Sequence, residues 1–143
     1  MSKIIIIGAG AAGLMSAVAV SKTCDVTIYD GNEKVGKKLY ITGKGRCNLT
    51  NASDEETFIK NVVTNPKFLY SAIYSYNQES VMTDFINWGV PLKTERGNRV
   101  FPISDHSSDI IKALTTQIKK NKIDIKTKVK EYCFSFHFLS DKI

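Results

Sequence analysis

The sequence predicts an α/β fold built on a parallel sheet, and three successive segments lead to this prediction. Residues 4–7 are a β-branched run that a glycine-rich turn follows at once. The turn opens an alanine-rich segment, 11–21, whose apolar residues have helical spacing. Residues 24–29 then resemble a second strand. Strand, turn, helix and strand fit into roughly 27 residues, near the minimum length of a βαβ unit.

The first strand is short and apolar throughout. Ile4 to Ile7 contain no polar residue that would mark a solvent-facing side. In parallel sheets such runs are typical of strands covered on both faces. We therefore expect this strand to be buried on both faces.

The middle of the chain predicts helices. Ser53 and Glu56 have the spacing of a capping box, which predicts a helix at about 54–62. A proline can start the helix predicted at about 66–76, and a glycine follows the one predicted at 79–88. This segment separates the βαβ unit from the remaining elements.

A hairpin, a helix and a third strand are predicted next. The hairpin covers residues 91–101, with its turn around a glycine. Ser107 or Ser108 is expected to cap a helix at 109–120. Residues 123–129 are predicted to form the third parallel strand. The predicted organisation is a βαβ unit with a loop (1–50), a helical and hairpin insertion (51–104) and a final helix and strand (105–143).

Composition excludes several classes of protein. The 143 residues suit one domain, and 43% hydrophobic with 24% charged residues is ordinary globular usage. Disordered, collagen-like and multi-span membrane chains are thereby excluded. The 3 cysteines are scattered and form no C-x-x-C pair, so neither a disulfide scaffold nor a metal site is expected. Reduced thiols indicate a cytoplasmic protein.

The positive charge gathers toward the end of the chain. The net charge is +6, and residues 106–143 carry eight lysines. A basic end could meet nucleic acid or an anionic cofactor. Arginine and interleaved aromatic residues are absent from the basic part, which favours a solvated lysine face. No nucleic-acid partner is expected.

One apolar stretch near the N-terminus superficially resembles a secretion signal. Residues 4–20 are uncharged and follow Lys3. Three glycines interrupt the stretch, and a strand-like segment follows it directly. A strand, turn and helix explain all of these features, whereas a signal peptide explains only the apolarity. Neither secretion nor membrane insertion is expected.

The turn carries the pattern Gly8-x-Gly10-x-x-Gly13. The first glycine allows a tight turn off the strand, the second lets a pyrophosphate approach the backbone, and the third lets helix and strand pack closely. Asp30 ends the second strand, where its carboxylate can accept both hydroxyls of an adenosine ribose and would repel a 2′-phosphate. A Rossmann-like dinucleotide site is therefore predicted, with FAD and NAD both possible.

A glycine-rich basic loop, residues 36–51, follows the unit. It reads Gly-Lys-Lys-Leu-Tyr-Ile-Thr-Gly-Lys-Gly-Arg-Cys-Asn-Leu-Thr-Asn. Such a loop offers backbone N–H groups and cations to an anionic ligand. It lacks the spacing of a nucleoside-triphosphate phosphate loop.

This loop resembles the motif of the bacterial flavoprotein family that includes the BaiN-type bile-acid reductases and the aminoacetone oxidase-like NAD(P)/FAD-dependent oxidoreductases. Two later blocks, 88–105 and 108–114, resemble further motifs of the same family in the same order. The resemblance covers about residues 3–131. It implies a Rossmann-like FAD/NAD(P)-binding fold.

The resemblance also assigns residues to the FAD site. The expected set combines the glycine turn, the acidic residue with its neighbour, and the basic loop: Gly8, Gly10, Ala11, Ala12, Gly13, Asp30, Gly31, Lys38, Thr42, Gly45, Arg46, Cys47 and Asn48. Arg46 is expected near flavin N1 and the C2 carbonyl, where a cation favours the anionic reduced ring. Cys47 is expected to be a small packed residue rather than a catalytic thiol. No catalytic acid or base is identified.

The function implied is hydride transfer from NAD(P)H through FAD to a small organic substrate. The alternative is a nucleotide-binding fragment without activity, because family members are much longer and the fold is expected to be incomplete. Residues 134–143 read like the start of a β-meander that ends early. Whether the chain is an enzyme, and its oligomeric state, stay open.

Overall fold

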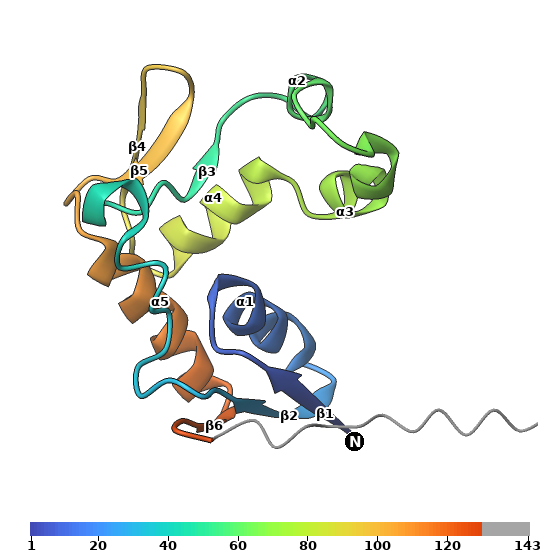
Figure 1. The fold of residues 1–143 in the computed structure, drawn as a ribbon, viewed down its shortest axis with the longest axis vertical. Coiled ribbons are helices and arrows are strands. Elements are labelled where there is room, and N and C mark those ends of the chain that lie inside the picture. The colour runs from blue at the N-terminus through green and yellow to red at the C-terminus, as the bar shows by residue number, and fades with distance from the viewer. Residues whose placement is uncertain (130–143) are drawn as a thin grey trace, which may run out of the picture.

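The computed structural model describes residues 1–129, which form two small sheets connected by helices (Figure 1). The first sheet holds β1 (Ser2–Ile7), β2 (Cys24–Tyr29) and β6 (Asp124–Lys126) in the order β1-β2-β6. Both strand pairs are parallel, with Ile4 opposite Val26 and Thr27 opposite Asp124. The predicted three-stranded parallel sheet is confirmed, and β6 is shorter than the predicted strand.

Two helices pack on one face of this sheet, α1 (Ala11–Val20) and α5 (Ser107–Lys120). Figure 1 shows both on the same side of the strands. Their buried side chains meet those of β2 in a common core: Leu14, Ala17, Val18, Val26, Ile28, Ile110, Leu114 and Ile118. This core fixes the start of α1 against the ends of the parallel strands.

The other face of the sheet is open, which contradicts the expectation that the first strand is buried on both faces. Ile5 is 60% exposed and Ile7 is 54% exposed. Both alternate with Ile4 and Ile6, which face α1 and are partly buried. Within the described residues both helices lie on one side, and β1 is an edge strand, so nothing covers its second face.

The helical insertion follows the prediction closely. It contains α2 (Glu55–Lys60), a 3₁₀ turn (Pro66–Leu69), α3 (Tyr70–Ser75) and α4 (Gln78–Asn87). Pro66 occupies the first turn, and Gly89 follows α4 with φ of 85°. In α4, Phe85 is buried with its ring centroid 5.0 Å from that of Trp88.

A second, antiparallel sheet forms around the predicted hairpin. The strands β4 (Leu92–Glu95) and β5 (Arg99–Pro102) pair as expected, and β3 (Thr50–Asn51) joins β5 from the other side. β3 was expected to be part of the basic loop. Figure 1 shows the hairpin at the far end of the molecule from the parallel sheet, with α5 between them.

Two predicted helix caps are wrong by one residue. The cap of α2 is Asp54, whose carboxylate accepts a hydrogen bond from the Thr57 N–H at 2.7 Å, rather than Ser53. The cap position of α5 is His106, because Ser107 already belongs to the helix and is buried. The Ser107 hydroxyl donates to the Tyr40 carbonyl, 3.4 Å away.

The β-meander expected at residues 134–143 lies outside the described residues. Over residues 1–129, no helix is both long enough and apolar enough to cross a membrane.

Candidate functional site

The glycine turn between β1 and α1 has the geometry that its pattern predicts. Gly8 adopts φ of 101°, a backbone conformation that favours glycine. A Cβ on Gly13 would lie 1.9 Å from the Gly8 carbonyl oxygen, so helix and strand pack too closely for any side chain there. The Gly8 N–H donates to the Tyr29 carbonyl at 2.7 Å, which fixes the turn to the end of β2.

Gly10 stands in open space, unlike Gly13. A Cβ built on Gly10 would find no atom within 4 Å. Gly10 is the N-cap of α1, makes no side-chain capping bond, and no acidic residue follows in the first turn. The first N–H groups of a helix have no partner within the helix and bind anions well. An anionic group can therefore reach this backbone, because glycine has no side chain that would cover it.

A pocket of about 380 Å³ opens beside this turn. Residues from the turn, from the end of β2 and from the following loop line it: Ala9, Gly10, Ala11, Asp30, Asn32, Lys34, Lys37, Lys38, Leu39 and Thr42. Such a volume lies within the range of small-molecule and cofactor sites. The glycine turn, the acidic residue and the basic loop thus meet at one place, as predicted.

Asp30 has a fixed orientation at the end of β2. Its Oδ2 accepts from the Ala9 N–H at 2.6 Å, and its Oδ1 accepts from the Asn32 N–H at 2.6 Å and from Asn32 Nδ2 at 2.9 Å. Burial alone would raise the pKa of Asp30, but the bonds from Ala9 and Asn32 outweigh it and hold the pKa below its usual value. The carboxylate is therefore charged at neutral pH and keeps lone pairs that can accept hydroxyls.

Three lysines of the pocket lining give it a positive charge. Lys34, Lys37 and Lys38 are exposed and form no ion pair with other described residues. The loop that carries them is held against the turn, because the Gly36 N–H donates to the Ala9 carbonyl at 2.7 Å. One acidic end and one basic wall fit a ligand that combines a sugar with phosphates.

These residues fit an adenine dinucleotide. The uncovered turn at Gly10 and the start of α1 suit a pyrophosphate, and the lysines add cations on the same side. Asp30 stands where a ribose can donate its hydroxyls. Gly10, Ala11, Asp30, Lys38 and Thr42, the predicted site residues that line the pocket, would hold such a group. The fit rests on shape and charge together.

The remaining predicted site residues lie outside this pocket. Gly45 ends the 3₁₀ turn Thr42–Gly45, and Arg46, Cys47 and Asn48 follow it. Gly8, Ala12 and Gly13 belong to the glycine turn and the start of α1 and do not line the pocket. Gly31 follows Asp30 but does not line the pocket either. Their assignment to a flavin therefore stays a prediction.

Arg46 and Cys47 have partners within the protein. Arg46 donates from Nε to Asp105 at 2.7 Å and from Nη2 to Glu95. Cys47 is 1% exposed, and burial raises the pKa of its thiol more than the hydroxyl of Thr42 lowers it. Its thiol is protonated at neutral pH, consistent with a packed residue rather than a reactive thiolate.

Some pocket residues were missed by sequence reasoning. Asn32, Lys34 and Lys37 line the pocket without having been assigned to it. A signal was present for Asn32, because an Asp-x-Asn stretch after a strand favours the side-chain turn observed here. The lysines were noted as basic residues, but their spacing does not indicate which of them face the ligand.

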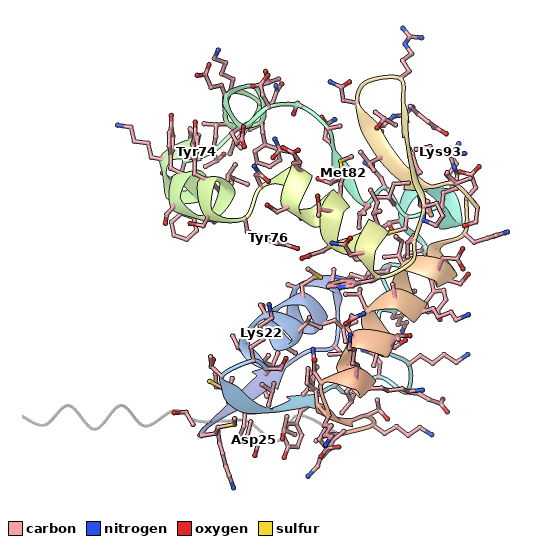
Figure 2. The ribbon with its side chains drawn as sticks, turned by 180° about the vertical axis from the view of Figure 1, so that it is seen from behind. Lys22, Asp25, Tyr74, Tyr76, Met82 and Lys93 are labelled. Atoms are coloured by element: carbon pink, nitrogen blue, oxygen red, sulfur yellow. The ribbon has the colours of Figure 1, made fainter. Side chains whose placement is uncertain are left out.

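A larger groove of about 630 Å³ lies elsewhere, between α1, α4 and α5. Figure 2 shows Tyr76 and Lys22 on either side of it. The Tyr76 hydroxyl donates to Asp84 at 2.7 Å, and Trp88 and Met15 add apolar surface. The groove contains no helix N-terminus or glycine turn, so it lacks the features that fit a dinucleotide.

Comparisons with known proteins show which family the chain resembles. The family model described as HI0933-like protein Rossmann domain matches residues 2–134. The 3-dehydro-bile acid delta(4,6)-reductase of Clostridium scindens is 30% identical over 133 residues, covering 91% of this chain and 32% of that protein. The ribosomal RNA dihydrouridine synthase of Haemophilus influenzae is 32% identical over 120 residues, covering 83% and 29%. The chain thus spans about a third of the length of these relatives.

The fold comparison points the same way. The crystal structure of Thermovibrio ammonificans THI4 has a TM-score of 0.56 and 10% identity, over 88% of this chain and 38% of that one. At this identity the likeness concerns the fold alone. The family match covers residues 2–134, nearly the whole chain. The chain therefore belongs to the HI0933-like family and forms its Rossmann domain.

Proposed function

We propose that this chain binds FAD in the pocket beside Gly10 and forms the FAD-binding part of an oxidoreductase. In this proposal hydride passes from NAD(P)H through FAD to a small organic substrate. The observation that carries the proposal is the convergence of an uncovered helix N-terminus, a charged Asp30 and three lysines on one pocket. FAD would supply the hydride chemistry when bound.

The residues of the chain bind and orient rather than react. The first-turn N–H groups of α1 would hold the pyrophosphate, with Lys34, Lys37 and Lys38 near its charge. Asp30 would orient the ribose, and its lowered pKa keeps it an acceptor at neutral pH. No described side chain in this pocket is placed as an acid or base, so the alternative of nucleotide binding without turnover stays part of the test.

A small unsaturated molecule is proposed as the hydride acceptor. The Clostridium scindens relative is named a delta(4,6)-reductase of a bile acid, which supports such a substrate. Two relatives are named ribosomal RNA dihydrouridine synthases, so RNA is the competing acceptor. The helical insertion disfavours RNA on its surface, since residues 51–90 contain two lysines against five carboxylates. A cytoplasmic location is proposed with this function.

An anaerobic reduction assay tests the proposal. The FAD-loaded chain is mixed with NADH or NADPH, and flavin absorbance near 450 nm is followed before and after adding a small unsaturated carbonyl compound or a uridine-containing RNA. Bleaching by a nicotinamide and recovery with the small molecule are expected. Recovery of the absorbance with RNA alone would show that RNA, and not a small molecule, is the hydride acceptor. Bound FAD that neither nicotinamide bleaches would favour nucleotide binding without turnover.

A further inference from the structure

The basic loop is attached to the rest of the protein at its start and at its end, and in between the Tyr40 carbonyl accepts a hydrogen bond from Ser107 of α5. We use the term cofactor loop for residues 36–48, which include the pocket residues Lys37, Lys38 and Thr42. At its start the Gly36 N–H is bonded to the Ala9 carbonyl of the glycine turn. At its end Arg46 reaches across to the β4–β5 hairpin. The position of the pocket residues between these points depends on both attachments.

The second attachment is a ring of four charges, here called the charge clamp: Arg46, Lys93, Glu95 and Asp105. Each cation contacts both carboxylates. Arg46 Nε lies 2.7 Å from Asp105 Oδ1 and Arg46 Nη2 contacts Glu95 Oε1. Lys93 Nζ lies 2.6 Å from Asp105 Oδ2 and 3.5 Å from Glu95 Oε1. Figure 2 places Lys93 on the hairpin.

The Phe101 ring packs against the Arg46 guanidinium of the clamp. The guanidinium carbon of Arg46 stands 4.1 Å from the ring centroid of Phe101, which is 3% exposed. A Cβ on Gly43 would lie 3.2 Å from the same ring, so the loop packs tightly there. The next residue after Arg46 is Cys47, which is 1% exposed. Opening the clamp would therefore lift the loop from Phe101 and uncover the Cys47 thiol.

The clamp is charged over the whole physiological pH range. Hydrogen bonds from Arg46 and Lys93 hold the pKa values of Glu95 and Asp105 below their usual ranges. Because these carboxyl pKa values are lowered, the pairing is complete at neutral pH and is lost only in acid, as the pH falls through the lowered values. The four side chains are between 29% and 42% exposed, so salt weakens the attraction between their charges.

One contact of the clamp, between Lys93 and Glu95, lies within the hairpin and does not involve Arg46. Lys93 and Glu95 are two residues apart on one face of β4, where they meet without help. The sequence separation of Arg46 from Glu95 is 49 residues and from Asp105 is 59 residues. These long-range bonds connect the loop to the hairpin, and their direct consequence is a fixed loop.

We propose that Glu95, Asp105 and Lys93 are positioning residues of the FAD site that act through Arg46 to hold the cofactor loop in its binding geometry. The proposal rests on the proposed function only for the identity of the ligand. It gives the β4–β5 hairpin a role in a pocket that it does not line. It also assigns Arg46 to the clamp, in place of the expected contact with the flavin ring.

The first test follows Cys47 in the chain without FAD. A thiol reagent is added, and peptide mass spectrometry follows Cys47 and Cys24 separately. The Glu95→Gln, Asp105→Asn double variant is compared with the wild type and with Glu56→Gln, which removes an exposed ion pair to Lys60 on α2. Cys47 labelling is expected to accelerate roughly two- to fivefold in the double variant, the size of effect typical of exposed ion pairs. The Cys24 rate should not change.

The outcome that overturns the proposal is an unchanged Cys47 rate in a folded double variant. Equal acceleration at Cys24 would also overturn it, because it would indicate general loosening. If the double variant does not fold by circular dichroism, Glu95→Gln alone and Lys93→Gln alone take its place with the same expectation. None of these measurements requires FAD.

The second test measures FAD affinity in the same proteins. The double variant is expected to weaken FAD binding by a similar factor, the difference from wild type should shrink in high salt, and Glu56→Gln should bind like wild type. Equal affinity alongside faster Cys47 labelling would overturn the link between clamp and site. Failure of the wild type itself to bind FAD would instead refute the proposed function, while the labelling result still decides whether the clamp holds the loop.

Discussion

At the scale of single residues, the three glycines of the turn have different physical roles although one pattern contains them all. Gly8 needs its backbone conformation, Gly13 needs the space, and Gly10 needs only to stay uncovered. A pattern search assigns the three roles in advance because each follows from where the residue falls between strand and helix. The structure confirms the roles of Gly8 and Gly13 directly.

The difference gives a matched pair of substitutions. Gly13→Ala forces a methyl group into the Gly8 carbonyl, so we expect a loss of about 3 kcal/mol or more in the free energy of unfolding. Gly10→Ala places its methyl group in open space, so the fold should survive while FAD binding is lost. Urea unfolding and FAD titration measure the two effects. A Gly13→Ala protein as stable as wild type would contradict the packing described here.

Other residue positions could not be predicted. The partners of Arg46 are Glu95 in the hairpin and Asp105 between β5 and α5, both far away in sequence, so the neighbours of Arg46 in the chain do not predict these ion pairs. Cys47 could be expected to pack as a small residue, but its burial beside Thr42 depends on tertiary structure. Charge and residue type predict which loop matters, and folding decides which side chains of that loop face the pocket.

At the scale of elements, the order of strands and helices could be predicted well because local patterns carry it. The spacing of apolar residues, the proline before α3 and the glycine after α4 mark boundaries to within a few residues. The strand β3 could not be predicted, because two residues show no periodicity and the pairing with β5 is long-range. The two caps were missed by one residue: Asp54 rather than Ser53 caps α2, and His106 occupies the cap position of α5 without a side-chain capping bond.

The start of α4 offers a test at this scale. The Asn77 side chain accepts a hydrogen bond from the Ser80 N–H at 2.8 Å and donates to Glu55 at 2.6 Å. Asn77→Ala should lower the free energy of unfolding by about 1 kcal/mol, because the cap is lost. Asn77→Ser keeps an accepting oxygen and should recover much of this difference. Equal stability of the alanine and serine variants would show that the cap contributes nothing.

At the scale of the whole molecule, the parallel sheet of residues 1–129 has one covered face and one open face. Parallel sheets in α/β proteins are usually covered on both faces, and β1 usually has a neighbour on each side in doubly wound folds. Here β1 is at the edge, with Ile5 and Ile7 exposed. Exposed apolar edge strands invite association with other chains.

The open face predicts concentration-dependent association of the chain. Ile5→Lys should reduce it, because the charge lies on the exposed face and opposes strand pairing. Val63→Lys is a matched control, since Val63 is 98% exposed and far from the sheet in sequence. Light scattering over a concentration series measures the effect. Association that Val63→Lys reduces as much as Ile5→Lys does would locate the sticky surface elsewhere.

The central claim is that residues from the glycine turn, Asp30 and the basic loop together hold FAD. The most direct measurement is a visible absorption spectrum of the purified chain after incubation with FAD and desalting, with circular dichroism to establish folding. We predict that the wild-type chain retains flavin bands and that the folded Gly10→Ala variant does not. A wild-type chain that is folded and colourless after desalting would contradict the claim.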